Sequence, residues 1–199
     1  GLSLAVAGST GKQSGVAALP LLRTQILLQP YFSYLGTGVG ADGTRNRYSP
    51  QASYFYKGFG GWFEYVHTNV PVLKGDVRDE ISKRAWQIAG SWVLTGEAAT
   101  DAAYGVRPRA NFDFGNGHWG AFQIAARYHA LEVDEEAITL GFATPGSSHK
   151  AEAWTVGLNW YLTGNLRYTF NFERTVFDDA VAEARHPENA VAFRTQIFF

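Results

Sequence analysis

Five arginines lie on the polar side of segments in which polar and apolar residues alternate, and their chemistry suits anion binding. The guanidinium group presents a planar fork of N–H donors that matches the oxygens of phosphate-like anions. Two carboxylates, Glu64 and Glu173, share this polar side, so basic residues are in excess. If these side chains lined a pore, they would favour anions. The five residues are Arg45, Arg47, Arg127, Arg167 and Arg194.

The same arginines admit a second interpretation. Each could pair with a neighbouring carboxylate and serve only to brace the wall that carries it. The formal net charge of −1 gives no whole-protein reason to expect nucleic-acid binding. Any preference for anions must therefore come from the local arrangement of charge.

Catalytic and metal-binding patterns do not stand out in this chain. The 5 histidines are scattered and show neither HxxH nor HExxH spacing, and no GxSxG motif is present. Because there is no cysteine, thiolate ligands and a cysteine nucleophile are excluded. We predict no catalytic residue, no metal site and no cofactor. The acidic residues between 132 and 136 could bind a divalent cation, or form a solvated acidic loop.

The elements that must position the arginines are β-strands. From Trp154 to Leu162, large apolar residues alternate with small or polar ones, and the pattern resumes after residues 163–165. This period of two is typical of a strand with one apolar face. A soluble sandwich could show the same alternation. The aromatic character of the apolar face, and charges well inside the polar face, favour a barrel wall between lipid and a wet lumen.

Applied along the chain, this pattern predicts an all-β protein, an antiparallel transmembrane β-barrel with about eight strands in a single region, residues 1–199. Each strand is long enough to cross a bilayer at a tilt. No apolar run approaches the roughly 18 residues that a transmembrane helix needs. The predicted strands cover about residues 1–9, 44–56, 59–70, 84–96, 118–132, 151–163, 165–177 and 190–199.

The predicted links are of two kinds. Tight turns at residues 57–58 and around Gly164 would lie on the periplasmic side, and long links at 10–43, 71–83, 133–150 and 178–189 would lie outside, as in outer-membrane barrels. The link at 97–117 breaks this rule, because it should be periplasmic and yet is long.

The link at residues 10–43 is too apolar for a purely solvated loop, since it carries several leucines and an isoleucine. One interpretation is a constriction loop that folds into the lumen and narrows it, with Arg23 presented to a permeating anion. The other is a loop that packs on a neighbouring subunit or on the barrel rim. The chain starts without a signal-peptide pattern and contains no methionine. We therefore expect either a processed mature protein or part of a longer one.

An ordered set of short motifs resembles the phosphate-selective porin O/P family over nearly the whole chain. No single motif is decisive, but the order and approximate spacing of the set are specific. The motifs are at residues 42–45, 49–52, 63–66, 91–97, 105–109, 120–122, 126–128, 156–162 and 186–190.

The resemblance implies a trimeric, sixteen-stranded porin of the bacterial outer membrane, of which this sequence is the C-terminal half. Its function would be a water-filled diffusion channel that prefers anions and selects phosphate or similar oxyanions. Its partners would be small anionic solutes such as phosphate, outer-membrane lipid and two further copies, with no nucleic acid. The alternative is a complete eight-stranded barrel that acts as an anchor, adhesin or membrane enzyme. Small residues on the polar side, such as Ala89, Ser91 and Gly157, favour the wider barrel.

Overall fold

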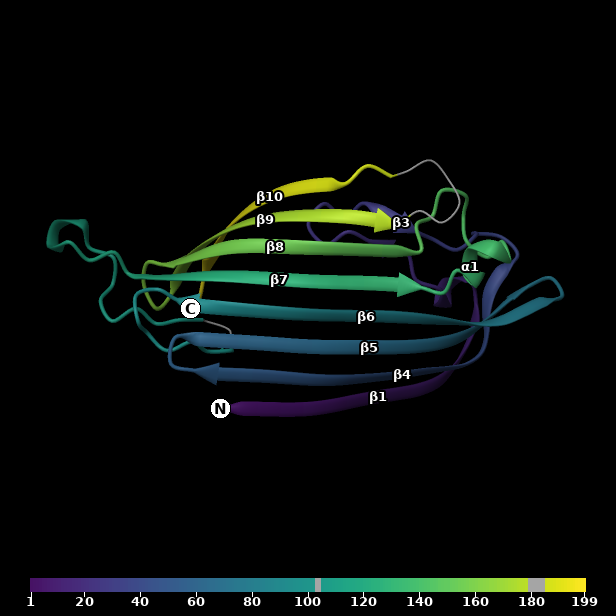
Figure 1. Cartoon of the computed structure of the whole chain (residues 1–199), viewed down its shortest axis with the longest axis horizontal. Helices are drawn as coiled ribbons and strands as arrows, with labels where there is room; N and C mark the ends of the chain where they lie inside the picture. The colour runs from purple at the N-terminus through teal and green to yellow at the C-terminus, as the bar shows by residue number, and fades with distance from the viewer. Residues whose placement is uncertain (103–104, 179–184) are drawn as a thin grey trace.

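The computed structural model describes residues 1–102, 105–178 and 185–199, and its main element is one antiparallel sheet (Figure 1). The sheet has eight strands, in the order β1-β4-β5-β6-β7-β8-β9-β10. These are β1 (Leu2–Gly15), β4 (Val39–Tyr56), β5 (Phe59–Lys74), β6 (Val77–Val93), β7 (Ala121–Val133), β8 (Lys150–Tyr161), β9 (Leu166–Asp178) and β10 (Glu188–Ile197).

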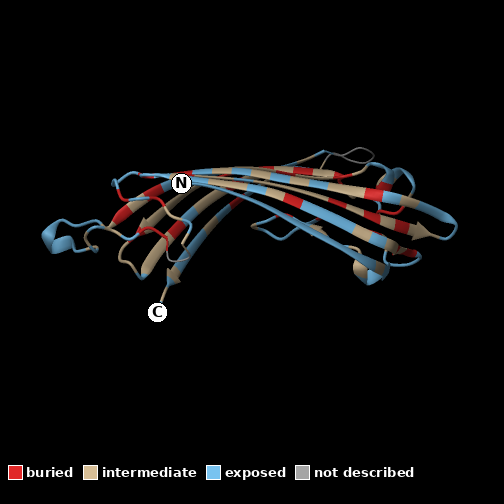
Figure 2. Ribbon diagram, turned by 90° about the horizontal axis from the view of Figure 1, so that it is seen from below, coloured by how far each residue is buried: buried red, intermediate tan, exposed pale blue. Residues whose placement is uncertain are grey.

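The prediction of eight antiparallel strands is confirmed, but the sheet does not close. Among the described residues β1 and β10 form its two edges, and neither pairs with the other. The sheet instead arches along its length (Figure 2). The alternative of a complete eight-stranded barrel is therefore wrong for this structure. An open, curved sheet is the shape expected for part of the wall of a wider barrel.

The prediction of a long link at residues 71–83 is wrong. Strand β5 runs on to Lys74, β6 begins at Val77, and residues 75–76 form a tight turn in which Gly75 has a φ of 58°, a region that glycine enters easily. The Gly, Pro, Asp and Ser residues of this stretch suggested a loop. The strands continue because alternate residues here, Val70, Val72 and Ile81, are buried beneath another segment.

Other strand boundaries differ from the prediction as well. Strand β1 extends to Gly15 and β4 begins at Val39, so the predicted link at 10–43 shrinks to residues 16–38. We call residues 16–38 the covering segment. It contains a 3-10 turn, η1 (Val16–Ala18), and a small hairpin of β2 (Leu22–Arg23) and β3 (Pro30–Phe32).

The two faces of the sheet differ, as the alternation predicts. The inner face is concave and carries the covering segment, which lies behind the strands in Figure 1 and beneath the arch in Figure 2. The outer face exposes large apolar side chains from neighbouring strands, such as Phe63, Ile88 and Trp154. No helix in the described part of the chain is long and apolar enough to cross a membrane.

The two ends of the sheet also differ. The turn end carries both termini and the links 57–58, 94–120 and 162–165 (Figure 1). The loop end carries the covering segment, the turn 75–76 and the link 134–149 with α1 (Glu136–Thr139).

The main hydrophobic core lies at the loop end, between the covering segment and the inner face. Phe32 from β3 and Phe142 from the link 134–149 are 1% and 0% exposed and pack with Val72 and Ile81 from the strands. This burial fixes the covering segment against the sheet. A smaller core at the turn end joins the link 94–120 to the strand ends.

Candidate anion pathway

The predicted lumen arginines all belong to the inner face, but they do not form one group. Arg45 and Arg47 lie together on β4, in the half nearer the loop end. Arg127 lies in the middle of β7, whereas Arg167 on β9 and Arg194 on β10 lie toward the turn end. The five arginines therefore fall into separate places along the inner face, and Arg45 and Arg47 share one cavity.

A third cation, Lys83 on β6, joins this pair. Thr68 on β5 is the register partner of both Arg47 and Lys83, and its hydroxyl accepts a hydrogen bond from Arg47 Nε at 3.1 Å. Lys83 Nζ lies 5.0 Å from the ring centroid of Tyr34 in the covering segment. We call Arg45, Arg47 and Lys83 the basic cluster.

The basic cluster lines a cavity of about 390 Å³ between the sheet and the covering segment. Leu19 and Leu22 of the covering segment form the opposite wall. None of the ion pairs among the described residues involves a member of the cluster. Uncompensated cations in a partly enclosed site attract anions, because the apolar wall reduces screening by water.

The sequence did not predict Lys83 among the inner-face cations, because the predicted strand began one residue later, at 84. The sequence does contain a signal for it. Lys83 has the same parity as Ala89 and Ser91, which were assigned to the polar side. Continuing the alternation across a charged residue would have placed Lys83 on the inner face.

Arg127 fits the second interpretation of the inner-face arginines, in which an arginine pairs with a neighbouring carboxylate and braces the wall. Its Nη2 lies 3.2 Å from Oε2 of Glu173, a carboxylate that is 2% exposed and also accepts a hydrogen bond from Thr155 Oγ1 at 2.7 Å. The charge of Arg127 is thus largely neutralised within the wall. This ion pair links β7 to β9 across β8.

Arg167 and Arg194 lie apart from the basic cluster. Arg167 donates hydrogen bonds to Gln196 and to the hydroxyl of Tyr161, the latter at 3.4 Å, and its guanidinium lies over the rings of Tyr161 and Phe198. Arg194 is exposed opposite Thr169. Both add positive charge near the turn end.

Arg23 lies in the covering segment, over the inner face. Its Nη1 donates a hydrogen bond to the carbonyl of Leu28 at 2.9 Å, within the hairpin of β2 and β3. It borders a separate cavity of about 350 Å³ that includes His129 and Thr175. Arg23 is therefore outside the basic cluster.

Two tyrosines of the covering segment are held in its core. Burial raises the pKa of Tyr31 and Tyr34 well above the usual range for a phenol, and the charge of Asp134 adds to the effect at Tyr34. Both phenols therefore stay neutral at any physiological pH. Tyr34 keeps its ring available to Lys83 without adding a charge of its own.

The long link predicted at residues 97–117 covers residues 94–120 in the structure. Its length is accounted for because its first part folds against the turn end of the sheet. The amide of Ala99 donates to the carbonyl of Lys57 at 2.7 Å, and the amide of Arg109 donates to Glu97 Oε1 at 3.3 Å. Burial alone would raise the pKa of Glu97, but hydrogen bonds from Thr95 and from backbone amides, with the charge of Arg109, lower it.

The turn-end half of the inner face also carries acidic groups. Asp101 from the link 94–120 shares a cavity of about 230 Å³ with Glu64 and Gln87 of the strands. The loop-end half is thus basic and this part of the turn-end half is acidic.

Two of the acidic residues at 132–136, Glu132 and Asp134, pair with Arg84 of β6. Arg84 Nη2 lies 2.8 Å from Glu132 and 3.5 Å from Asp134. In the described part of the chain, no group of three or more acidic or histidine side chains is arranged to hold a metal ion.

A family model described as phosphate-selective porin O and P matches residues 30–199. No curated protein matches the chain. The matched region includes every strand of the sheet except β1.

Proposed function

Because this chain belongs to the phosphate-selective porin O and P family, we propose that it forms part of an anion-preferring channel whose selective element is the basic cluster. Members of the family are outer-membrane porins. The chain is therefore a porin of the bacterial outer membrane, and a channel rather than an enzyme.

The basic cluster is the observation that carries the anion preference. Arg45, Arg47 and Lys83 face one cavity on the inner face, and no carboxylate among the described residues forms an ion pair with them. Two arginine forks and one ammonium group offer donors to several oxygens at once, which suits phosphate better than chloride. Phosphate and similar oxyanions are the solutes we propose.

The covering segment is proposed as the constriction. It spans the inner face from the basic cluster to the cavity beside Thr175, so a solute that crosses the channel passes this segment. Arg23 stands in this segment as an additional cation along the route.

We propose the wider assembly on two grounds, the open sheet and membership of the family. The eight strands would form half of a sixteen-stranded barrel, with three copies in the membrane. The turn end would face the periplasm, because outer-membrane barrels carry their shorter connections there. The covering segment and the basic cluster would then lie toward the outside.

Planar-bilayer recording of the full-length protein tests the anion preference. In a KCl gradient, we expect a reversal potential that indicates chloride preference, and we expect phosphate to block the chloride current. Replacing the cluster with glutamine, as Arg45→Gln, Arg47→Gln and Lys83→Gln together, should lower the anion-to-cation permeability ratio by about tenfold, equivalent to about 1.4 kcal/mol. Cation preference in the unmodified protein would contradict the proposal.

Arg84→Gln provides a matched control. Arg84 is adjacent to Lys83 but points to the opposite face, where it pairs with Glu132. Its loss should leave selectivity unchanged. An equal effect of Arg84→Gln and the triple variant would show that general charge, and not the basic cluster, sets the preference.

A further inference from the structure

We propose that the channel has a second subsite, next to the basic cluster, that binds the sugar ring of a phosphorylated sugar. The subsite is the cavity of about 230 Å³ in the turn-end half of the inner face. The proposal deepens the proposed function and rests on it, because the basic cluster supplies the site for the phosphate group. It adds a hydroxylated ring to the oxyanion that the channel selects.

The subsite and the basic cluster are neighbouring parts of one strip of the inner face. Gln51, Glu64 and Gln87 are register partners on β4, β5 and β6, and we call them the polar row. Thr68, which contacts the basic cluster, lies four residues from Glu64 along β5, or about 13 Å. Val66, the inner-face residue between them, lines the cavity of the basic cluster, whereas Glu64 lines the subsite. One elongated solute can therefore contact both cavities.

The polar row can exchange hydrogen bonds with hydroxyl groups. Gln51 Nε2 and Gln87 Nε2 donate to Glu64 Oε1 and Oε2 at 3.2 and 2.9 Å, which orients the three side chains. The amide oxygens of the two glutamines accept no hydrogen bond from the described residues. The carboxylate of Asp101, which lines the same cavity, has no hydrogen bond or ion pair with them either. All these oxygens can accept from the hydroxyls of a solute.

Trp62 supplies an aromatic wall beside the polar row. It lies two residues from Glu64 on the same face of β5, and its ring stands at 82° to that of Phe55, with centroids 5.0 Å apart. Its register partners Ser53 and Ala89 are small and leave room beside the indole. The C–H face of a pyranose can pack on this ring, and the indole N–H, which has no partner among the described residues, can donate to a hydroxyl.

The composition of the subsite favours a sugar over a simple cation. A metal cation needs several acceptor oxygens, and the described residues contain no group of three or more acidic or histidine side chains arranged to hold one. Glu64 already accepts hydrogen bonds from Ser49, Gln51 and Gln87. An indole, amides and carboxylates together offer an apolar surface, donors and acceptors, and a sugar ring presents the same three features in return.

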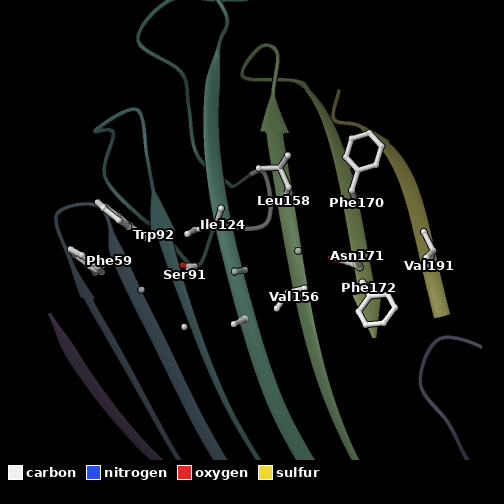
Figure 3. Close-up of a pocket in the computed structure, with 15 residues that line it drawn as sticks. Phe59, Ser91, Trp92, Ile124, Val156, Leu158, Phe170, Asn171, Phe172 and Val191 are labelled. Atoms are coloured by element: carbon white, nitrogen blue, oxygen red, sulfur yellow. The ribbon is translucent and has the colours of Figure 1, made fainter. Parts of the chain in front are cut away.

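This mixture of groups belongs to the inner face. On the outer face of the same sheet, the large side chains around the depression in Figure 3, such as Trp92, Ile124 and Phe170, are apolar. That surface is typical of a wall that meets lipid. An aromatic ring beside glutamine and carboxylate side chains is thus a local feature of the lumen and not a general property of the sheet.

Block of the chloride current by D-glucose 6-phosphate tests the proposal in planar bilayers that contain the full-length protein. We expect glucose 6-phosphate to reach half-block at a concentration about tenfold lower than inorganic phosphate does. Glycerol 3-phosphate, which has hydroxyls but no ring, should resemble inorganic phosphate. Glucose, which lacks the phosphate group, should not block at the same concentrations.

Two neutral substitutions test the subsite itself. Trp62→Leu removes the aromatic wall and Gln87→Leu removes one amide. Each should raise the half-blocking concentration of glucose 6-phosphate by about tenfold and leave that of inorganic phosphate unchanged. Trp86→Leu is the matched control, because Trp86 is adjacent to Gln87 but lies on the outer face, where it is exposed. It should change neither concentration. Circular dichroism of each variant verifies that it retains its β-structure.

Three outcomes would overturn the proposal. Equal block by glucose 6-phosphate and inorganic phosphate would show that the sugar adds nothing, and equal block by glycerol 3-phosphate would show that the ring is not recognised. An equal loss in Trp62→Leu and Trp86→Leu would show that the ring does not bind in this cavity. Each of these leaves the channel proposal intact as long as inorganic phosphate blocks. Cation preference with no block by inorganic phosphate would instead contradict the channel proposal, and the sugar subsite with it.

Discussion

At the scale of single residues, the charges of the inner face divide into paired and unpaired groups. Arg127 and the buried Glu173 neutralise each other, whereas Arg45, Arg47 and Lys83 have no carboxylate partner among the described residues. A charge that is already paired contributes little to the potential felt by a solute. The position of an arginine on the inner face is therefore not enough to make it part of the anion pathway.

The pairing of Arg127 predicts different effects for its two members. Glu173→Gln should free Arg127 and shift the reversal potential further toward anion preference. Arg127→Gln should leave a buried carboxylate unpaired and lower the free energy of unfolding by roughly 3–5 kcal/mol. Bilayer recording measures the first effect, and urea denaturation followed by tryptophan fluorescence measures the second.

Arg194→Gln is the comparison for this pair, since Arg194 is exposed and forms no ion pair among the described residues. Its stability change should stay within about 0.5 kcal/mol, as for most exposed positions. If Arg127→Gln were equally harmless, the ion pair with Glu173 would not stabilise the wall.

At the scale of the strands, the alternation of side chains assigns neighbouring residues to different solvents. Ile88 and Ala89 are adjacent on β6, and their register partners, Tyr128 and Arg127, belong to the outer and inner faces. The same substitution at these two positions should thus have different consequences.

Arginine at the two positions tests this assignment. Ile88→Arg places a charge on the hydrocarbon-facing side of β6 and should destabilise the inserted protein, by roughly 2–4 kcal/mol if the position lies near the bilayer midplane. Ala89→Arg projects into the wet interior and should be tolerated. Unfolding in urea from lipid vesicles measures both, and similar losses at the two positions would argue against a membrane wall.

The covering segment is the second element whose alteration should change the properties of the channel. It is anchored by Tyr31, Phe32 and Tyr34 and lies over the inner face between the basic cluster and β9. Replacing residues 20–29 with a short glycine-serine link would remove the part that spans the face and keep the anchoring residues.

We expect this replacement to raise single-channel conductance, because the route past the sheet becomes wider. Lengthening the turn 75–76 with glycine and serine is the control, since that turn extends beyond the sheet at the same end without crossing the inner face (Figure 1). Conductance that is insensitive to loss of residues 20–29 would show that the covering segment does not constrict the channel.

At the scale of the whole molecule, the edges of the sheet decide its architecture. Strands β1 and β10 each pair on one side only among the described residues. An unpaired edge is costly in a membrane, since its amides and carbonyls find no water there. In the proposed sixteen-stranded barrel, other strands would pair with both edges.

Hydrogen exchange of the full-length protein in lipid tests this closure. Amides of β1 and β10 should be as well protected as those of the central strand β6. Exchange of either edge at the rate of the link 134–149 would contradict a closed wall. Native mass spectrometry in the same preparation should give the mass of three copies if the proposed trimer is correct.

The sequence predicted the strands well where alternation is uninterrupted, as in β8 and β9, where the boundaries differ from the structure by only a few residues. It was wrong at residues 71–83, where Gly, Pro, Asp and Ser residues suggested a loop. Tertiary burial of Val70 and Ile81 extended the strands there. The family, too, was recognisable from the order of short motifs, and the family model confirms it.

By itself, the sequence determined which side chains share a face, because the period of a strand is a local property of the backbone. It could not determine which inner-face charges meet. Arg127 finds Glu173 two strands away, and Lys83 joins Arg47 across Thr68, and both depend on the register between strands. Only the tertiary structure decided that register, and with it which cations remain free to attract an anion.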